Sequence, residues 1–434
     1  MDPRDLAPDD VLLNHIFPNQ PHVSIDTIFV QTWDKCVFKA SFTDACKPDT
    51  SKPPSSYLVR LEVAFGDEEA IRFATVSAMQ QIASFAIHKL IPKTYETDVA
   101  NNAQDKRVYF SLTEFVEGET LEDVWEQMSH ENQRSVVTDL VEALRKLHSF
   151  RIRDFLDRIQ YFFGQNVLLR DPGTPGEHIL GGAEVMGGPS TGFFAPKDGP
   201  SLLCAIANRW ELSGRPFHTM TTTDAGDIII QSEYQDFASV KVEKSSMEEW
   251  YREAVLCHND LTPSNIIVSR PRESASASAS TSLHGASDYK LSAIIDWELS
   301  GFYPASYELS LQDTYLGRGY RLNSFYSLLK SQMKDIVPRS PSQVSLLQAM
   351  GLIFESSQRR LVEGVNVGAL VREGFMQRLQ LRRDEDPYLG WVPKDEEAAQ
   401  LVLSPADYQG LEDDAFAKMK AARQTKRCES SLLT

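Results

Sequence analysis

The sequence predicts an α+β protein with two lobes, a small strand-rich lobe followed by a larger, mainly helical one. Three observations lead to this prediction. The chain has 434 residues, whereas single hydrophobic cores stop growing at about 250–300 residues. Short runs rich in β-branched and aromatic residues dominate the chain up to Gly118. Beyond that glycine, apolar residues recur mostly with helical spacing.

The first lobe is expected to contain short strands separated by polar, proline-rich turns. A helix over residues 67–87 is predicted because its apolar side chains recur every three or four positions. Gly118 interrupts the pattern, so we expect lobe boundaries of 1–118 and 119–434, with nucleotide binding assigned to the first lobe. The predicted strands are residues 27–31, 36–42, 57–63 and 107–115.

The second lobe is expected to be helical with two irregular interruptions. Residues 131–150 carry one apolar stripe, with Ser129 as the expected N-cap, and further helices are predicted over 325–333 and 345–356. Residues 171–200 are rich in glycine and proline and should be mostly irregular. The serine-rich stretch within 271–287 is of low complexity and is expected to be a mobile loop.

Charge and cysteine content exclude several classes of protein. The 44 basic and 61 acidic residues give a net charge of −17, which repels phosphate backbones, so neither nucleic acid nor an anionic membrane is an expected partner. The five cysteines are scattered along the chain and lack the spacing of zinc ligands, so neither a disulfide framework nor a structural zinc site is expected. Neither a signal peptide nor an apolar run of about 18 residues is present, so a cytoplasmic location is the expectation. The oligomeric state is not specified.

The most informative segment reads Cys-His-Asn-Asp-Leu-Thr-Pro-Ser-Asn over residues 257–265 and runs directly into the apolar strand 266–268. Asp260 and Asn265 are five residues apart on a tight loop, so the two side chains can converge. A carboxylate there can accept a proton from a hydroxyl, and an amide oxygen can ligate a hard cation. The competing interpretation is a turn in which these side chains only cap a strand.

A second segment favours the chemical interpretation. Residues 291–295 form another apolar strand, which ends at Asp296. Two short strands joined by a loop pair as a hairpin, which would bring Asn265 beside Asp296. We therefore predict a Mg²⁺ site for nucleotide phosphates, with Asp260 alongside as the base.

Together, HNDLTPSN and IIDWE resemble the signature of the aminoglycoside phosphotransferase and choline kinase-like family, whose members are relatives of the protein kinases. A weaker resemblance extends over about residues 57–309 and includes FVEGETL and LRKLHSF. The resemblance implies a two-lobed, protein-kinase-like fold. It also implies a phosphotransferase that uses ATP and Mg²⁺ to phosphorylate a small-molecule hydroxyl.

The same resemblance implies a role for each matching residue of the second lobe. Asp260 would orient and deprotonate the acceptor hydroxyl, and Asn265 and Asp296 would hold Mg²⁺. His258 is expected to order the loop. Glu298 is either an acid that supports the site or contacts substrate, or a plain surface residue.

In the first lobe the resemblance is less complete. Arg60 stands where the family often has a phosphate-pairing lysine, and Glu114 and Val116 match the backbone that binds adenine. The following helix has Thr75 where a glutamate is expected, so the usual ion pair cannot form. The loop over residues 31–35 has no glycine to cradle phosphates. These departures question ATP affinity more than catalytic competence.

Two classes of function therefore remain. The first is a small-molecule kinase, supported by Asp260, Asn265 and Asp296. The second is a catalytically inactive, pseudokinase-like binding module, supported by Thr75 and the glycine-free loop. The acceptor is expected to be recognised by residues 154–253 and the C-terminal tail; acidic side chains there would suit a cationic acceptor or would serve solubility.

Overall fold

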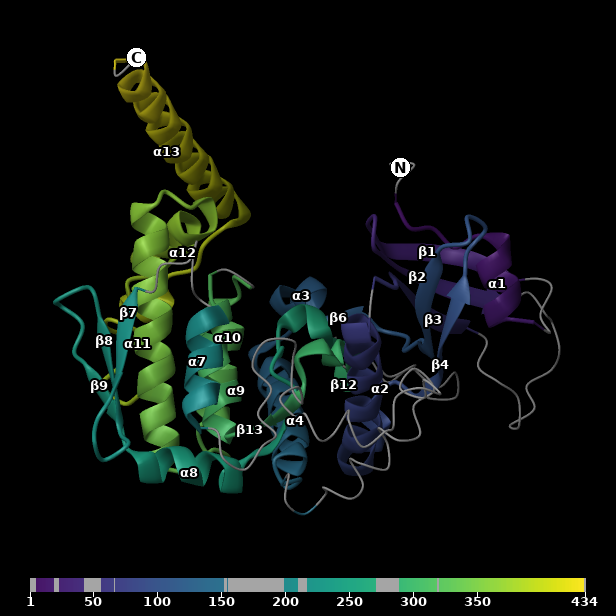
Figure 1. Ribbon diagram of the computed structural model, residues 1–434, viewed down its shortest axis with the longest axis horizontal. Helices are drawn as coiled ribbons and strands as arrows, with labels where there is room; N and C mark the ends of the chain where they lie inside the picture. Colours follow the sequence, from purple (N-terminus) through teal and green to yellow (C-terminus); the bar gives the residue numbers. More distant parts are fainter. Residues whose placement is uncertain are drawn as a thin grey trace, which may run out of the picture.

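The structure is a computed structural model that describes residues 5–18, 23–42, 56–65, 67–151, 154, 199–209, 217–270, 289–317 and 320–432. Figure 1 shows a strand-rich part that contains the N-terminus beside a mainly helical part that contains the C-terminus. The predicted α+β class with two lobes is confirmed. The expectations for 271–287 and for 171–198 lie outside the described residues.

The N-terminal part is built on one antiparallel sheet of five strands, in the order β1-β2-β3-β5-β4. The predicted strands and the helix α2 are found with slightly different ends. Its elements are α1 Asp10–Ile16, β1 Val23–Gln31, β2 Lys35–Phe42, β3 Ser56–Val63, α2 Asp67–Ile87, β4 Thr94–Asn101 and β5 Arg107–Glu114.

The two faces of this sheet differ in chemistry because side chains alternate along each strand. One face packs on α1 and forms a separate small core, which includes Leu12, Ile16, Phe38, Val59, Leu61 and Phe110. On the opposite face, Val37 pairs with Arg60, and Arg60 pairs with Ser111, so these side chains point the same way. This second, more polar face is turned toward the rest of the protein.

The C-terminal part contains most of the helices and several short sheets. Its helices are α3 Leu121–Val124, α4 His130–Leu147, α7 Gly199–Arg209, α8 Lys244–Glu253, α9 Ala305–Tyr315, α10 Asn323–Met333, α11 Pro341–Glu363, α12 Val367–Arg378 and α13 Pro405–Leu432. Its strands are β6 Glu119–Thr120, β7 His218–Thr222, β8 Ile228–Ser232, β9 Val240–Val242, β10 Val255–Cys257, β11 Ile266–Ser269, β12 Lys290–Ile294, β13 Gly301–Tyr303, β14 Leu381–Arg383 and β15 Trp391–Pro393.

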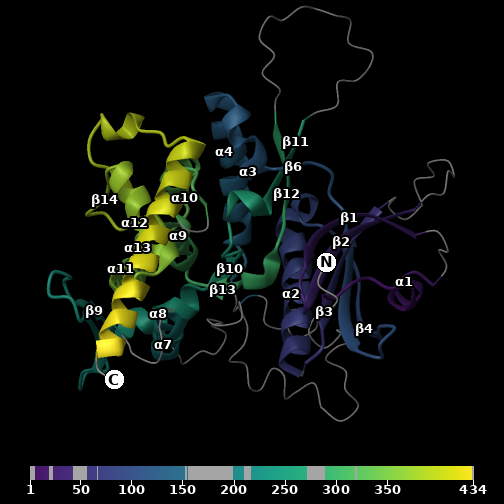
Figure 2. The ribbon, with the colours of Figure 1, turned by 90° about the horizontal axis from the view of Figure 1, so that it is seen from above.

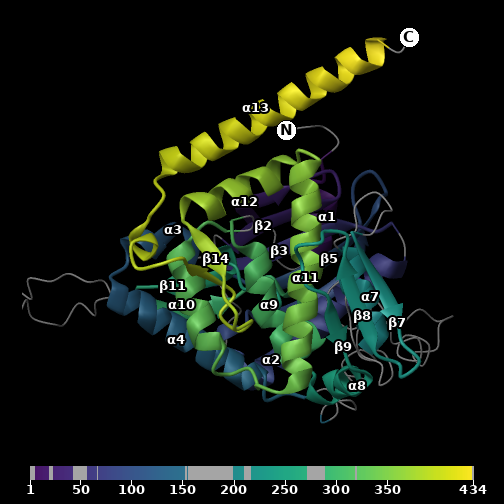
Figure 3. The same ribbon diagram turned by 90° about the vertical axis from the view of Figure 1, so that its left-hand side faces the viewer.

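Helix α4 illustrates how the sequence specifies this part. The Ser129 hydroxyl accepts a hydrogen bond of 3.2 Å from the N–H of Asn132, which confirms the predicted N-cap. The apolar stripe of α4, including Val136, Leu140 and Leu144, is completely buried in the large core shared with α9, α10 and α11. On the outside, α13 packs against α12 and then projects beyond it (Figure 3).

Some elements were not anticipated. Strand β4 lies at a sheet edge and leaves most side chains partly or fully exposed, so it lacks the apolar alternation that marks a strand in sequence. Of the stretch over 171–200 that is predicted to be mostly irregular, the structure describes only residues 199 and 200, which begin α7. Among the described residues, helices long and apolar enough to cross a membrane are absent.

Candidate active site

The predicted hairpin is formed by strands β11 and β12. Ile266 pairs with Ile294, and the N–H of Ile295 donates a hydrogen bond of 2.9 Å to the carbonyl of Asn265. Asn265 therefore lies opposite Ile295, directly beside the backbone of Asp296. Strand β6 adds to the other edge of β11, so the hairpin is the core of a three-stranded sheet (Figure 2).

The predicted convergence of Asp260 and Asn265 is seen as a direct contact between their side chains. Asn265 belongs to a 3₁₀ turn that begins at Pro263, and its Nδ2 donates to Asp260 Oδ2 at 2.8 Å and to the Asp260 carbonyl at 3.0 Å. Since Nδ2 is committed to Asp260, the amide oxygen Oδ1 is the atom of Asn265 that can face a cation.

His258 fixes the backbone on which Asp260 lies. Its Nε2–H donates to the carbonyl of Ile295 at 2.9 Å, while Nδ1 accepts from the N–H of Asp260 at 3.2 Å. Burial lowers the pKa of His258 to about 4, against a smaller opposing effect of Glu308. The imidazole is therefore neutral near pH 7 and orders the loop, as the resemblance implied.

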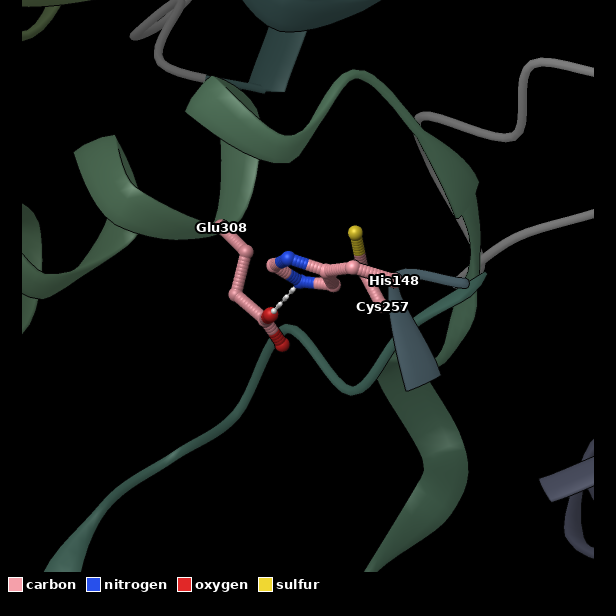
Figure 4. Close-up of side chains that lie close together, drawn as sticks. All are labelled: His148, Cys257 and Glu308. Carbon is pink, nitrogen blue, oxygen red and sulfur yellow. Dashed lines mark hydrogen bonds and ion pairs between the residues drawn. The ribbon is translucent and has the colours of Figure 1, made fainter. Parts of the chain in front are cut away.

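The buried carboxylate of Glu308 also stabilises this loop. Glu308 of α9 accepts hydrogen bonds from the N–H groups of His258 at 2.7 Å and Asn259 at 2.8 Å, and pairs with Nε2 of His148 at 2.9 Å (Figure 4). Burial alone would raise the pKa of Glu308, but the bond from His148 and the backbone bond from Asn259 outweigh it and leave the pKa lowered.

Cys257 lies beside this pair, and the ligand atoms of His148, Cys257 and Glu308 lie within 4.8 Å of one another. Such a group could hold a metal by distance alone. Burial raises the pKa of the Cys257 thiol well above its usual value. Its Sγ is 3.5 Å from the carbonyl oxygen of Val255 and 3.7 Å from that of Tyr303, as a protonated donor would be. We interpret the group as part of the loop's support, because zinc binds the thiolate rather than the thiol.

The acids of the site repel one another. Burial and the nearby charge of Asp296 raise the pKa of Asp260 to about 6, although the hydrogen bond from Asn265 opposes the shift. Burial and Glu298 likewise raise the pKa of Asp296. Asp296 also has a φ of 60°, a left-handed conformation that non-glycine residues adopt at a cost. Raised carboxylate pKa values and a left-handed non-glycine residue are found more often at functional sites than at stabilising ion pairs.

Opposite this pair, cations of the N-terminal sheet reach the hairpin. Lys35 Nζ lies 2.9 Å from Glu298 Oε1, and Arg60 Nη1 pairs with the same oxygen. Arg60 also donates from Nε to Glu62 at 2.6 Å. Burial would raise the pKa of Glu298, but Arg60 and Lys35 lower it to about 2. Glu298 is thus neither exposed surface nor isolated.

These groups surround a cavity of about 400 Å³ between the polar face of the sheet and the β11–β12 hairpin. Arg60, Glu114, Val116, Asn265 and Asp296 all line it, whereas Asp260 is not among its lining residues. Its apolar walls include Val30, Val37, Leu58, Val76, Ile267 and Ile295. The predicted nucleotide and metal residues are therefore brought to one cavity.

The backbone predicted to bind adenine lines this cavity. The N–H of Glu114 donates to the carbonyl of Lys93 at 2.8 Å, so that donor is committed within the protein. Val116 follows the end of β5, and within the described part of the chain its backbone forms no hydrogen bond to another backbone group. Val116 is therefore the better donor for a ligand.

The glycine-free loop closes on itself. Thr32 N–H donates to the Lys35 carbonyl at 2.8 Å, and Lys35 N–H donates to the Thr32 hydroxyl at 3.1 Å. These amides are used inside the turn and are not directed at a ligand. Thr75 lies on α2, but its side chain is outside the described part of the structure.

Sequence reasoning missed three residues of the site. Lys35 could have been found, because strand alternation puts it on the face of Val37, which lies opposite Arg60. Arg209 of α7 lies near enough to Asp260 to oppose the rise in the pKa of Asp260. Arg209 belongs to no motif that the sequence analysis identified. In the sequence, Glu308 cannot be told from an ordinary exposed acid of a helix. Only its burial in the structure shows that it supports the loop.

This chain resembles known proteins both in sequence and in structure. A model of the phosphotransferase enzyme family matches residues 50–172 of this chain. The predicted family resemblance is confirmed. The matched residues include Arg60, Glu114 and Val116 but end before Asp260, so the loop and hairpin motifs are a separate indication of the same phosphotransferase family. Among curated proteins, none matches this chain closely enough to count as a relative.

Solved structures of aminoglycoside phosphotransferases are among those that resemble this chain. One, bound to GDP and kanamycin, has 11% identity and a TM-score of 0.41 over 84% of this chain and 97% of its own. A thermostable mutant bound to AMP-PNP and hygromycin B has 11% identity and a TM-score of 0.38, over 85% and 98%. A putative one from Ralstonia eutropha has 13% identity and a TM-score of 0.38, over 93% of both chains.

Proposed function

We propose that this protein is a MgATP-dependent phosphotransferase that acts on a small-molecule hydroxyl. The observation that carries the proposal is the contact between Asp260 and Asn265 beside Asp296, at a cavity whose opposite wall bears Arg60. A base, two oxygen ligands for a cation and a phosphate-binding cation are the parts that phosphoryl transfer needs. The match of residues 50–172 to a phosphotransferase family supports the same class.

Asp260 is the proposed base. Its raised pKa of about 6 is suited to a group that accepts a proton near neutral pH. The acceptor hydroxyl gives its proton to the Asp260 carboxylate, its oxygen bonds to the γ-phosphorus, and the bond from that phosphorus to the bridging oxygen breaks to release ADP. Asn265 keeps the carboxylate oriented for this transfer through its 2.8 Å hydrogen bond.

Asn265 and Asp296 are the proposed holders of Mg²⁺. Both offer oxygen, the ligand that Mg²⁺ prefers. Burial, and after it the charge of Glu298, raise the pKa of Asp296, and a bound divalent cation would favour its ionised form. When bound, Mg²⁺ supplies positive charge to the phosphates.

ATP itself is proposed to occupy the cavity with its base near Val116 and its phosphates near Arg60. The apolar walls suit a flat ring, and a pocket of this size suits a nucleotide or part of one. Lys35, whose side chain shares the phosphate end with Arg60, adds a second cation there.

The acceptor is proposed to be a small molecule that bears a hydroxyl near Asp260. A cationic acceptor would be favoured by the acidic chain as a whole, with its net charge of −17. Arg209 acts in the other direction, because it places a positive charge near Asp260. The acceptor panel should therefore include amino sugars, amino alcohols and uncharged polyols.

A binding module that turns over no nucleotide is the second candidate, and two observations favour it. The amides of Thr32 and Lys35 are consumed inside their turn. The guanidinium of Arg60 is already paired with both Glu62 and Glu298. In a binding module, these contacts would take donors away from phosphates instead of orienting them.

The deciding experiment is calorimetric titration of wild-type protein with ATP, with and without Mg²⁺, followed by ADP-release assays over the acceptor panel. Asp296→Asn should lose the Mg²⁺-dependent part of ATP binding. Glu117→Gln, which changes an acid whose side chain is 72% exposed, is the matched control. Absence of MgATP binding at millimolar nucleotide would refute the proposal. Binding without ADP release on any acceptor would favour the binding module.

A further inference from the structure

A cluster of charges joins the N-terminal sheet to the hairpin. Lys35 of β2 and Arg60 of β3 both contact Oε1 of Glu298, which lies two residues beyond Asp296. Side-chain exposures of 30% for Lys35, 17% for Arg60 and 22% for Glu298 place the cluster largely out of solvent. Ion pairs in such surroundings are screened less than those on an open surface.

Helix α2 contributes an aromatic residue at this point. The buried Phe73 of α2 has its ring centroid 5.8 Å from the guanidinium carbon of Arg60. The same helix packs against the 3₁₀ turn Trp297–Leu299, which carries Glu298. The helix thus supports the segment that provides the acid.

The turn that carries Glu298 is rigidly tied to the catalytic loop. Trp297 Nε1 donates to the carbonyl of Ile294 at 2.9 Å, and the Ser300 hydroxyl donates to the carbonyl of Trp297 at 2.6 Å. The Trp297 ring also packs edge-on against His258, with centroids 4.6 Å apart. The position of Glu298 is therefore fixed relative to Asp296 and the loop.

We propose that Glu298 is a positioning residue that holds Arg60 and Lys35 for the phosphates of the nucleotide, in place of the glutamate that Thr75 replaces on α2. The inference rests on the proposed function. The guanidinium of Arg60 is held along one edge by Glu62 and through Nη1 by Glu298, which fixes its plane. Lys35, which shares Glu298, is drawn from the sheet toward the same end of the cavity.

This role differs from that of a metal ligand, and a double-mutant cycle separates the two. The variants are Glu298→Gln, Arg60→Met and both together, with Glu117→Gln as the control. The readouts are the dissociation constant for AMP-PNP, the Mg²⁺ concentration for half-maximal binding, and the melting temperature. A residue that acts through Arg60 should lose most of its effect once Arg60 is gone.

We expect Glu298→Gln to weaken AMP-PNP binding at least tenfold in the wild-type background and at most threefold in the Arg60→Met background. The Mg²⁺ requirement should shift less than twofold. A similar loss in both backgrounds, accompanied by a higher Mg²⁺ requirement, would identify a metal ligand and overturn the inference. Unchanged or tighter nucleotide binding by Glu298→Gln would overturn it as well.

If Glu298→Gln fails to fold, Glu298→Asp replaces it in the cycle, since it keeps the charge and withdraws the carboxylate by about 1.5 Å, one carbon–carbon bond. The wild-type titration distinguishes failure of the proposed function from failure of this inference. Wild-type protein that binds no MgATP would overturn the proposed function together with this inference. Wild-type binding with additive effects in the cycle would overturn this inference alone.

Discussion

The side-chain amide of Asn265 donates a 2.8 Å hydrogen bond to the carboxylate of Asp260. This bond orients the carboxylate and at the same time turns the amide oxygen of Asn265 away from it. One contact therefore arranges both the proposed base and one of the proposed metal ligands. It forms because the turn Pro263–Asn265 folds the chain back over the four residues that lie between them.

Asp260→Asn should abolish transfer without harming the fold. We expect at least a hundredfold loss of turnover, the range for a general base, with MgATP affinity changed only a few-fold. Because burial and Asp296 raise the pKa of Asp260, the ionised carboxylate is unfavourable in the folded state. The melting temperature at pH 7 should therefore stay the same or rise. A marked loss of stability would instead indicate a structural acid.

Asp296→Asn should separate nucleotide binding from stability in a different way. The Mg²⁺-dependent part of ATP affinity should disappear, because an amide lacks the charge of the carboxylate. Relief of the repulsion from Glu298 should keep the melting temperature near or above that of wild type. Calorimetry with and without Mg²⁺ measures the first effect, and thermal unfolding measures the second. ATP affinity that still responds to Mg²⁺ would contradict the assignment.

Glu308→Gln should be strongly destabilising, unlike the two aspartate variants. Glu308 is completely buried and accepts from two backbone N–H groups and His148, so loss of its charge weakens three interactions at once. We expect a loss of about 3 kcal/mol or more in the free energy of unfolding, because each hydrogen bond to a charged group is worth about 1.5–3 kcal/mol. Urea denaturation tests this, with the exposed Glu117→Gln as the control.

His258 should make stability depend on pH. Its pKa of about 4 in the folded protein is below its ordinary value of 6.5, so the unfolded chain binds its proton first as the pH falls. Stability should be full above pH 6.5 and should decline toward pH 4, by up to about 3 kcal/mol.

This effect is best measured against a variant. Asp260, whose pKa is raised, acts in the opposite direction, so both proteins should carry Asp260→Asn. The decline between pH 6.5 and 5 should be shallower once His258→Gln is added. Parallel stability curves for the two proteins would show that His258 does not titrate as expected.

The long connection between β11 and β12 should be replaceable. Ser269 pairs with Lys290, and the hydroxyl of Ser292 donates a hydrogen bond of 2.7 Å to the hydroxyl of Ser269. The two strands are therefore paired at the point where the connection begins. Replacing residues 271–288 with Asn-Gly flanked by one glycine on each side should leave the melting temperature and MgATP affinity nearly unchanged. Loss of nucleotide binding would show that the removed residues contribute to the site.

The contacts of the site that could be predicted from the sequence are those between residues close together in the chain. Asp260 and Asn265 lie in one short loop, and Asn265 reaches Asp296 through a hairpin, so local rules of turns and strand pairing were sufficient. The ion pairs of Glu298 were not predictable, because they join segments that are more than 200 residues apart in the chain. The same applies to Glu308 and His148, which are 160 residues apart.

Strand β6 connects the backbone at Val116 to the strand that begins beside Asn265, and both of these segments line the cavity. From Val116 the chain passes through Gly118 into β6, whose Glu119 and Thr120 pair with Val268 and Ile267, close to Asn265. A β-carbon on Gly118 would lie only 2.5 Å from the carbonyl oxygen of Val268. A side chain at position 118 would therefore push β6 away from β11, and would disturb both the backbone at Val116 and the strand that begins beside Asn265.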